Sequence, residues 1–342
     1  MTILFACHHE FPPYSRGGGE LTAKDLLTDL ANYFGIQVWI LAGSKSCTEE
    51  QKYKYEGLDV NRVPEEEFET QAHQMIESIQ PNLIVTYGIR LTSKVLDIAH
   101  EHSIPVAFLI MEGRGVFEGL NGFDKPPEIL VVLSDYLGNL IRDHFGYNYF
   151  KYPPKFEKLS ESTLLSPASR FDFQTVGMVN PNRVKGGMMF DQLAGKFINN
   201  KFLATDGWSD VESAPKVNLK SPNIQVLNWQ EDISSFYNSI SVLLIPSLCP
   251  EGFGRVAREA CLYGIPILAS NRGALKESSC DAGILLNPVD LDFWIIALKK
   301  IISSYQFYLE VVQKTLKAPY DYMDQDEKIR LETIRAFQKF FI

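Results

Sequence analysis

Two glutamates, Glu251 and Glu259, stand eight residues apart with a glycine-rich stretch, Gly252–Gly254, between them. An apolar run precedes this stretch and helical spacing follows it, which predicts strand, loop and helix in that order. Glycine lets a backbone approach a ligand closely, and the free amides at a helix start suit an anion such as a diphosphate. Glu259, about one turn into the predicted helix, can reach a pair of hydroxyl groups.

These residues also have plainer interpretations. Two glutamates at this spacing occur in many acidic, helix-rich chains, where they are surface charge or a helix-capping carboxylate. Lys185 can be an ordinary lysine at a helix start, and Trp229 can be either a flank for a nucleotide base or a half-buried cap on the core. The strand–loop–helix setting of Glu251, and Gly186 beside Lys185, favour a binding site.

The elements that must position these residues alternate along the chain as strand and helix. Buried strands are predicted at 3–7, 37–41, 83–86, 106–110, 129–133, 175–179, 201–204, 224–227, 242–245, 265–269 and 284–286. Helices are predicted at 20–33, 67–79, 92–102, 135–144, 187–198, 233–237, 255–262 and 291–302. This alternation predicts parallel sheets covered on both faces, so the expected fold class is α/β.

A proline-containing stretch without periodicity, 149–167, divides the chain. We therefore expect an amino-terminal domain over 1–155 and a carboxy-terminal domain over 165–320. A final helix at about 323–342 is expected to pack back on the first domain. Ligands of open α/β sheets bind beyond the carboxyl ends of the strands, so the site is expected between the two halves.

Composition limits the class of protein and its partners. The 342 residues suit about two domains, and 45% hydrophobic with 22% charged residues excludes disorder, collagen and coiled coil. The net charge is −9, and residues 1–150 carry 11 basic against 21 acidic side chains. We expect no nucleic-acid partner and no stable membrane association, because both surfaces attract basic proteins.

Cysteine and histidine usage indicates compartment and metal content. Five cysteines without a Cys-x-x-Cys pair indicate reduced thiols. No secretory signal is evident, and the longest uncharged run, 233–250, is too polar for a bilayer, so a cytoplasmic protein is expected. The six histidines form no His-x-x-x-His pair, so no metal site is expected.

Five motifs in chain order carry a family resemblance. They are Phe11–Glu20 with its three glycines, Val176–Gly186 with its Lys-Gly turn, Glu251–Glu259 of the form E-x7-E, Arg272–Glu277 and Gly283–Pro288. Together they resemble the retaining nucleotide-sugar glycosyltransferases of the GT-B fold, family GT4. The likeness is strong over 175–290 and weak over 40–150.

The resemblance implies a fold and a reaction. GT-B enzymes consist of two Rossmann-like, doubly wound parallel-sheet domains that face each other across a cleft. The first domain would bind the acceptor and the second the nucleotide-sugar donor. A hexosyl group would move to an acceptor, with the leaving phosphate acting as base. The acidic excess of residues 1–150 indicates that this acceptor is soluble: a small molecule, a sugar or a peptide. Neither a metal nor another cofactor is expected, and the enzyme would be a monomer or homodimer.

The resemblance also implies roles for individual residues. Glu251 would bind the hydroxyls of the donor sugar, and Glu259 the nucleotide ribose. Lys185, helped by Arg183, would neutralise the diphosphate as it leaves. The remaining residues expected around the donor are Gly17, Gly18, Gly177, Trp229, Gly252, Phe253, Gly254, Arg255 and Val256.

One departure from the family lies in the first half. The family places a histidine near the donor sugar after a front-half strand, whereas Met111-Glu112-Gly113-Arg114-Gly115 follows that strand here. Glu112, Arg114 and His8 are the candidate acceptor or sugar contacts instead.

Two alternatives to a transferase stay open. One is another GT-B enzyme, a sugar-nucleotide epimerase or a phosphorylase. The chain is short for a cofactor-dependent phosphorylase, and the Glu-Gly-Phe-Gly loop is typical of transferases rather than epimerases. The other alternative is a non-catalytic binding subunit, which the missing histidine makes credible. Against it stands the retention of Glu251, Glu259 and Lys185 together.

Overall fold

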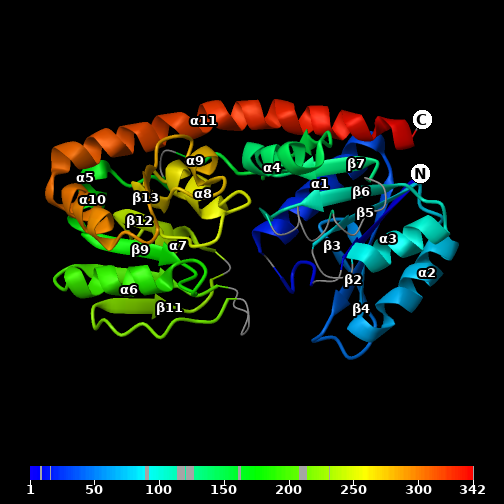
Figure 1. Cartoon of the computed structure of the whole chain (residues 1–342), viewed down its shortest axis with the longest axis horizontal. Coiled ribbons are helices and arrows are strands. Elements are labelled where there is room, and N and C mark those ends of the chain that lie inside the picture. Colours follow the sequence, from blue (N-terminus) through cyan, green and yellow to red (C-terminus); the bar gives the residue numbers. More distant parts are fainter. Residues whose placement is uncertain are drawn as a thin grey trace. The chain divides into compact units, whose positions relative to one another are not determined.

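The computed structural model describes residues 1–7, 10–15, 17–88, 92–113, 120, 127–160, 163–207, 214–230 and 232–341. These residues form two compact units, one of residues 1–155 and 326–342 and one of residues 156–325. Each unit is built on its own β-sheet (Figure 1). Within the described part of the chain, no helix has both the length and the apolar character needed to cross a bilayer.

The sheet of the first unit has eight strands, and all neighbours are parallel except β3 and β4. Their spatial order is β3 (Gln51–Tyr55), β4 (Leu58–Pro64), β2 (Gln37–Ser44), β1 (Thr2–Cys7), β5 (Leu83–Tyr87), β6 (Val106–Ile110), β7 (Ile129–Val132) and β8 (Phe150–Lys151). The helices are α1 (Gly18–Phe34), α2 (Phe68–Ile79), α3 (Thr92–Glu101) and α4 (Asp135–Phe145), with a short 3-10 helix at Glu65–Glu67.

The central strand β1 separates the two cores of this unit. Its alternate residues Ile3 and Phe5 pack with α1, whereas Leu4 and Ala6 pack with α2 and α3, which lie together on the opposite face (Figure 1). Strands buried on both faces read as continuous apolar runs, which is why these strands were predictable. Phe337, after the last long helix, belongs to the same core as Ile3 and Phe5.

The sheet of the second unit has six strands, all parallel. Their order is β11 (Ile224–Leu227), β10 (Lys201–Thr205), β9 (Thr175–Val179), β12 (Val242–Ile245), β13 (Ile267–Ser270) and β14 (Ile284–Leu286). Counted along the chain this is the Rossmann order 3-2-1-4-5-6, whose direction reverses between β9 and β12. Ligands of such sheets bind beyond the carboxyl ends of the strands at this reversal.

Helices connect the strands of the second unit. They are α5 (Pro167–Asp172), α6 (Gly187–Lys196), α7 (Ser234–Tyr237), α8 (Arg255–Leu262), α9 (Leu275–Ser278), α10 (Leu291–Ser303) and α11 (Tyr305–Ala336), the last followed by a 3-10 turn at Phe337–Phe340. Helix α11 runs through Pro319 and contributes residues to both units. The predicted α/β class, with two parallel-sheet domains, is confirmed.

The structure adds elements that the sequence did not predict. Strands β3 and β4 form a hairpin. In β3, Gln51–Tyr55, lysine and tyrosine side chains alternate, so this strand is not an apolar run. Helix α11 begins at Tyr305, well before the predicted start near 323, and it continues through Pro319. A proline removes one backbone hydrogen bond from a helix interior, but it does not end this helix.

Candidate functional site

Two loops meet at the point where the strand order of the second sheet reverses. One follows β9 and the other follows β12, and the amide of Leu248 in the second donates to the carbonyl of Val184 in the first at 2.8 Å. Within the first loop the side chain of buried Asn182 accepts a hydrogen bond from the amide of Lys185 at 2.9 Å. This turn fixes the backbone from which the Lys185 side chain extends.

Two glycines let three loops pack closely around Glu251. Gly186 has φ +87° and touches the second loop so closely that a Cβ there would overlap the carbonyl of Pro246. Gly273 has φ +63°, and a Cβ there would overlap the backbone of Glu251. Both conformations favour glycine. The amide of Ala274 then donates to the carbonyl of Glu251 at 2.9 Å, so the loop after β13 holds Glu251 as well.

Lys185 and Glu251 form an ion pair in this place. The Nζ of Lys185 lies 2.7 Å from each carboxylate oxygen of Glu251, and the hydroxyl of Ser247 donates to Oε1 at 2.5 Å. The Lys185 and Glu251 side chains keep 21% and 12% of their surface exposed, and Ser247 is buried. A cation and a carboxylate are thus fixed together, yet accessible, beyond the ends of β9 and β12.

Glu259, in helix α8, is held by two partners. The hydroxyl of Tyr237 donates to its Oε2 at 2.7 Å, and Nε of Arg255 lies 3.6 Å from its Oε1. Tyr237 is fully buried, and burial, followed by the negative charge of Glu259, raises its pKa well above the usual value. The phenol therefore remains a proton donor at neutral pH.

The first turn of α8 is packed against aromatic rings. The guanidinium of Arg255 lies over the ring of Phe156 at 4.7 Å. Phe253 is buried and stacks on the same ring, with centroids 6.0 Å apart. Gly254 caps the helix in the left-handed conformation, and Val256 packs half-buried against the neighbouring core. This packing fixes the direction of the helix amides.

The structure brings some of the predicted donor residues together and places others elsewhere. Lys185, Glu251 and the start of α8 lie at the carboxyl edge of the second sheet. Gly177 lies inside β9, where a Cβ would come 2.5 Å from Ile240, so packing explains this glycine. Trp229 is 57% exposed, and the exposed Arg183 donates its amide to the carbonyl of Pro215.

The remaining predicted residues belong to the first unit. Gly17 is the N-cap of α1 and Gly18 its first residue. The carboxyl of Glu20 lies so close to Gly17 that a Cβ on Gly17 would collide with it. Burial raises the pKa of Glu20, although Ser15 hydrogen-bonds it. The Glu20 carboxyl thus lies at the start of α1, where the resemblance predicts residues around the donor.

Of the three candidate acceptor or sugar contacts, the structure places one. Glu112 is exposed and lies directly beyond β6 in the first unit. His8 and Arg114 lie outside the described residues.

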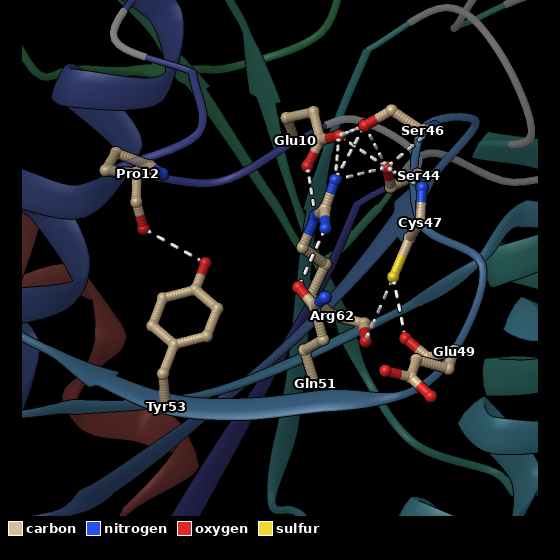
Figure 2. A network of polar contacts seen from close by, with 9 residues as sticks. All are labelled: Glu10, Pro12, Ser44, Ser46, Cys47, Glu49, Gln51, Tyr53 and Arg62. Atoms are coloured by element: carbon tan, nitrogen blue, oxygen red, sulfur yellow. Dashed lines mark hydrogen bonds and ion pairs between the residues drawn. The ribbon is translucent and has the colours of Figure 1, made fainter.

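A polar network at the carboxyl ends of β1 and β2 has no counterpart in the sequence motifs (Figure 2). Arg62 donates to both oxygens of Glu10 at 2.7 Å and to the hydroxyls of Ser44 and Ser46. Burial favours a higher pKa for Glu10, but the Arg62 hydrogen bonds and those of the serines outweigh it and lower the pKa. The network ties the loop after β1 to β2 and β4, and Arg62 also lies 4.2 Å from the ring of Tyr14.

Sequence reasoning missed three residues that hold the site. Ser247 had a usable signal, because a small polar residue follows a strand end there. Asn182 lies inside the Val176–Gly186 motif, in which the Lys-Gly turn is the recognisable part. Tyr237 gave no signal, since it reads as an apolar position of a short helix.

Comparisons with known proteins agree on the fold. Residues 189–304 match the family model Glycosyl transferases group 1. A sucrose-phosphate synthase from Thermosynechococcus elongatus is similar over 100% of this chain and 99% of its own, with 14% identity and a TM-score of 0.76. The Anabaena protein HepE, solved with UDP-glucose, is similar over 99% and 100%, with 14% identity and a TM-score of 0.72.

Two further proteins are also similar to this chain. A trehalose 6-phosphate synthase from Burkholderia multivorans is similar over 98% of this chain and 97% of its own, with 10% identity and a TM-score of 0.70. An uncharacterized 41.2 kDa protein in the cps region of Klebsiella pneumoniae is 36% identical over 73 residues, and this match spans a fifth of each chain. The chain therefore has the GT-B fold of these structures, and the segment that matches the group 1 glycosyl transferase model lies within its second unit.

Proposed function

We propose that the protein is a retaining, GT4-type transferase that moves a hexosyl group from a nucleoside-diphosphate sugar to an acceptor bound by the first unit. The observation that carries the proposal is the Lys185–Glu251 ion pair, accessible at the strand-order reversal of the second sheet. A fixed cation beside a fixed carboxylate suits a ligand with both a diphosphate and sugar hydroxyls.

The proposed reaction uses these groups as follows. The bond between the sugar C1 and the diphosphate oxygen breaks, and the acceptor oxygen bonds to C1 on the same face. The acceptor proton passes to the leaving phosphate. Lys185 and the amides at the start of α8 stabilise the charge that grows on the diphosphate. Glu251 holds sugar hydroxyls, and Glu259 holds the ribose.

The similar structures indicate which donor to test first. HepE has been solved with UDP and with UDP-glucose. We therefore propose a uridine diphosphate hexose as the donor. For the acceptor we propose a soluble, neutral or cationic molecule, because residues 1–150 carry a large excess of acidic side chains.

All five cysteines are free thiols and four are buried, which supports a cytoplasmic setting.

A binding screen followed by a stereochemical assay tests this function without a known acceptor. Thermal unfolding with UDP, GDP, ADP and their glucose conjugates should show a rise in Tm for one nucleotide, because a ligand stabilises the state that it binds. Proton NMR of slow donor hydrolysis should then show glucose released first as the α-anomer, as in the donor. The β-anomer would refute retention, and no shift with any nucleotide would refute the donor site.

Activity is expected to survive chelation. We propose that Lys185 and the α8 amides stabilise the leaving diphosphate, which is the task that a divalent cation performs in other enzymes. Donor hydrolysis should proceed at the same rate in excess EDTA and in EDTA presaturated with magnesium. Loss of activity in EDTA that magnesium or manganese restores would contradict this prediction.

A further inference from the structure

Tyr237 touches the residue that we assign to the nucleotide ribose. We infer that Tyr237 is a positioning residue, which orients the Glu259 carboxylate so that the second unit prefers a ribonucleotide to its 2′-deoxy analogue. This inference rests on the proposed function, because that function gives Glu259 its ligand. It starts from the hydrogen bond that the Tyr237 hydroxyl donates to Glu259 Oε2 at 2.7 Å.

The ring of Tyr237 is fixed on several sides. It is fully buried and stacks on the ring of Tyr263, with centroids 5.0 Å apart. Its own carbonyl accepts a hydrogen bond from the Arg170 guanidinium at 2.6 Å. Arg170 is itself buried and also donates to the carbonyl of Ile240, so two hydrogen bonds hold its guanidinium next to Tyr237. The phenol therefore presents its hydroxyl to Glu259 in one direction.

This fixed donor decides which lone pairs of Glu259 face a ligand. A carboxylate has about four acceptor positions on its two oxygens. Tyr237 takes one on Oε2, and the Arg255 guanidinium lies beside Oε1 at 3.6 Å. Neither contact uses all the acceptor positions of its oxygen, and 24% of the side-chain surface is exposed. Two adjacent hydroxyls, such as the 2′ and 3′ hydroxyls of ribose, match two adjacent oxygens.

Removal of one ribose hydroxyl would leave part of this carboxylate without its ligand hydrogen bond. Sites built to bind a hydroxyl reject the analogue that lacks it, because their own polar group is then left unsatisfied. The selection needs a carboxylate held in one orientation. A carboxylate free to rotate can turn its oxygens toward the single remaining hydroxyl or toward water, and the preference then falls.

The test compares dissociation constants for UDP and 2′-deoxy-UDP by calorimetry. If the screen above favours GDP or ADP, the corresponding pair is used. The wild-type protein is expected to bind the ribonucleotide about 10-fold more tightly or more, where 10-fold is the lower end for one hydrogen bond to a charged group. Tyr237→Phe should reduce this ratio to about 3-fold or less, mainly by weakening the ribonucleotide.

Tyr308→Phe is the matched control. Tyr308 is also fully buried in the second unit, but its hydroxyl donates to the backbone carbonyl of Ser241 at 3.1 Å. Loss of the Tyr308 hydroxyl should leave the ratio of the two dissociation constants unchanged.

Glu259→Asp is a second variant for the case that Tyr237→Phe does not fold. It keeps the charge but draws the carboxylate back from the phenol, and it should also lower the ratio.

The outcomes separate the positioning role of Tyr237 from the ribose role of Glu259 and from the proposed function. A Tyr237→Phe protein that folds and keeps the wild-type ratio overturns the positioning role. So does a Glu259→Asp protein that keeps it. If the wild type binds the nucleotide without a preference, and Glu259→Gln binds it equally well, then the ribose role of Glu259 in the proposed function is wrong. If the wild type binds no nucleoside diphosphate, the proposed function itself fails.

Discussion

Glu251→Ala is expected to lower turnover of the sugar nucleotide about 100-fold or more, while free UDP still binds. In the proposed function, Glu251 contacts the sugar hydroxyls, and contacts that strengthen as the sugar loses its leaving group act on the rate. The carboxylate is prearranged for this task by Ser247, the Lys185 ammonium and the amide of Ala274, which donates to its backbone carbonyl. Alanine removes the carboxylate and leaves this surrounding frame.

The ion pair makes the expectation for UDP more specific. Without a ligand, the Lys185 ammonium lies against both oxygens of Glu251 at 2.7 Å. Removal of the carboxylate leaves this cation for the diphosphate, so UDP should bind Glu251→Ala as tightly as the wild type or more tightly. Rate and affinity should therefore change in opposite directions, or only the rate should change. A general loss of folding cannot produce that pattern.

The experiment measures UDP release from UDP-glucose together with calorimetry of UDP. Glu310→Ala is the control, because Glu310 is an exposed glutamate of the same unit that interacts with Gln306. It should change neither quantity. Equal losses of UDP affinity and turnover in Glu251→Ala would instead assign Glu251 to the ribose or the phosphates.

Much of the fold could be predicted because burial on both faces leaves a direct trace in the sequence. Strands such as β1 and β12 are short apolar runs, and Gly254 and Gly264 mark the ends of α8. The hairpin of β3 and β4 left no such trace. Its outer strand, Gln51–Tyr55, lies at the sheet edge, where polar side chains can face solvent and only cross-strand pairing defines the element.

The candidate site was predictable only in part, for a similar reason. Glu251 and Lys185 were found because the close loops around them need glycines such as Gly254 and Gly186, which occur in recognisable motifs. Partners that act through one hydrogen bond have no such requirement. Tyr237 reaches Glu259 across 22 residues, and Arg62 reaches Glu10 across 52, so neither spacing forms a local pattern.

Gly177 shows that a glycine in such a motif can also have a packing role. It lies in a motif that resembles a donor-binding strand, and this resemblance predicts a contact with the donor. In the structure it is a strand residue whose missing side chain makes room for Ile240. Glycine serves both close ligand approach and close packing, and sequence alone does not separate the two.

Lys185→Ala is expected to weaken UDP binding by about 2 to 3 kcal/mol, roughly 30- to 150-fold, as for a lost charge-assisted contact. The structure places this loss at the upper end of the range. Without the ammonium, the largely buried Glu251 carboxylate keeps Ser247 as a hydrogen-bond donor but loses the Lys185 cation. Its negative charge then faces the diphosphate and repels it.

This reasoning predicts a non-additive double variant. Lys185→Ala with Glu251→Ala should bind UDP more tightly than Lys185→Ala alone, because the second substitution removes the repelling charge. Lys216→Ala is the control. Lys216 forms an exposed ion pair with Asp206 at 2.6 Å in the same unit, and such pairs contribute little. UDP affinity should stay unchanged in that control.

Unchanged affinity in Lys185→Ala as well would remove Lys185 from the phosphate site. A double variant that binds no better than Lys185→Ala would show that Glu251 does not face the diphosphate.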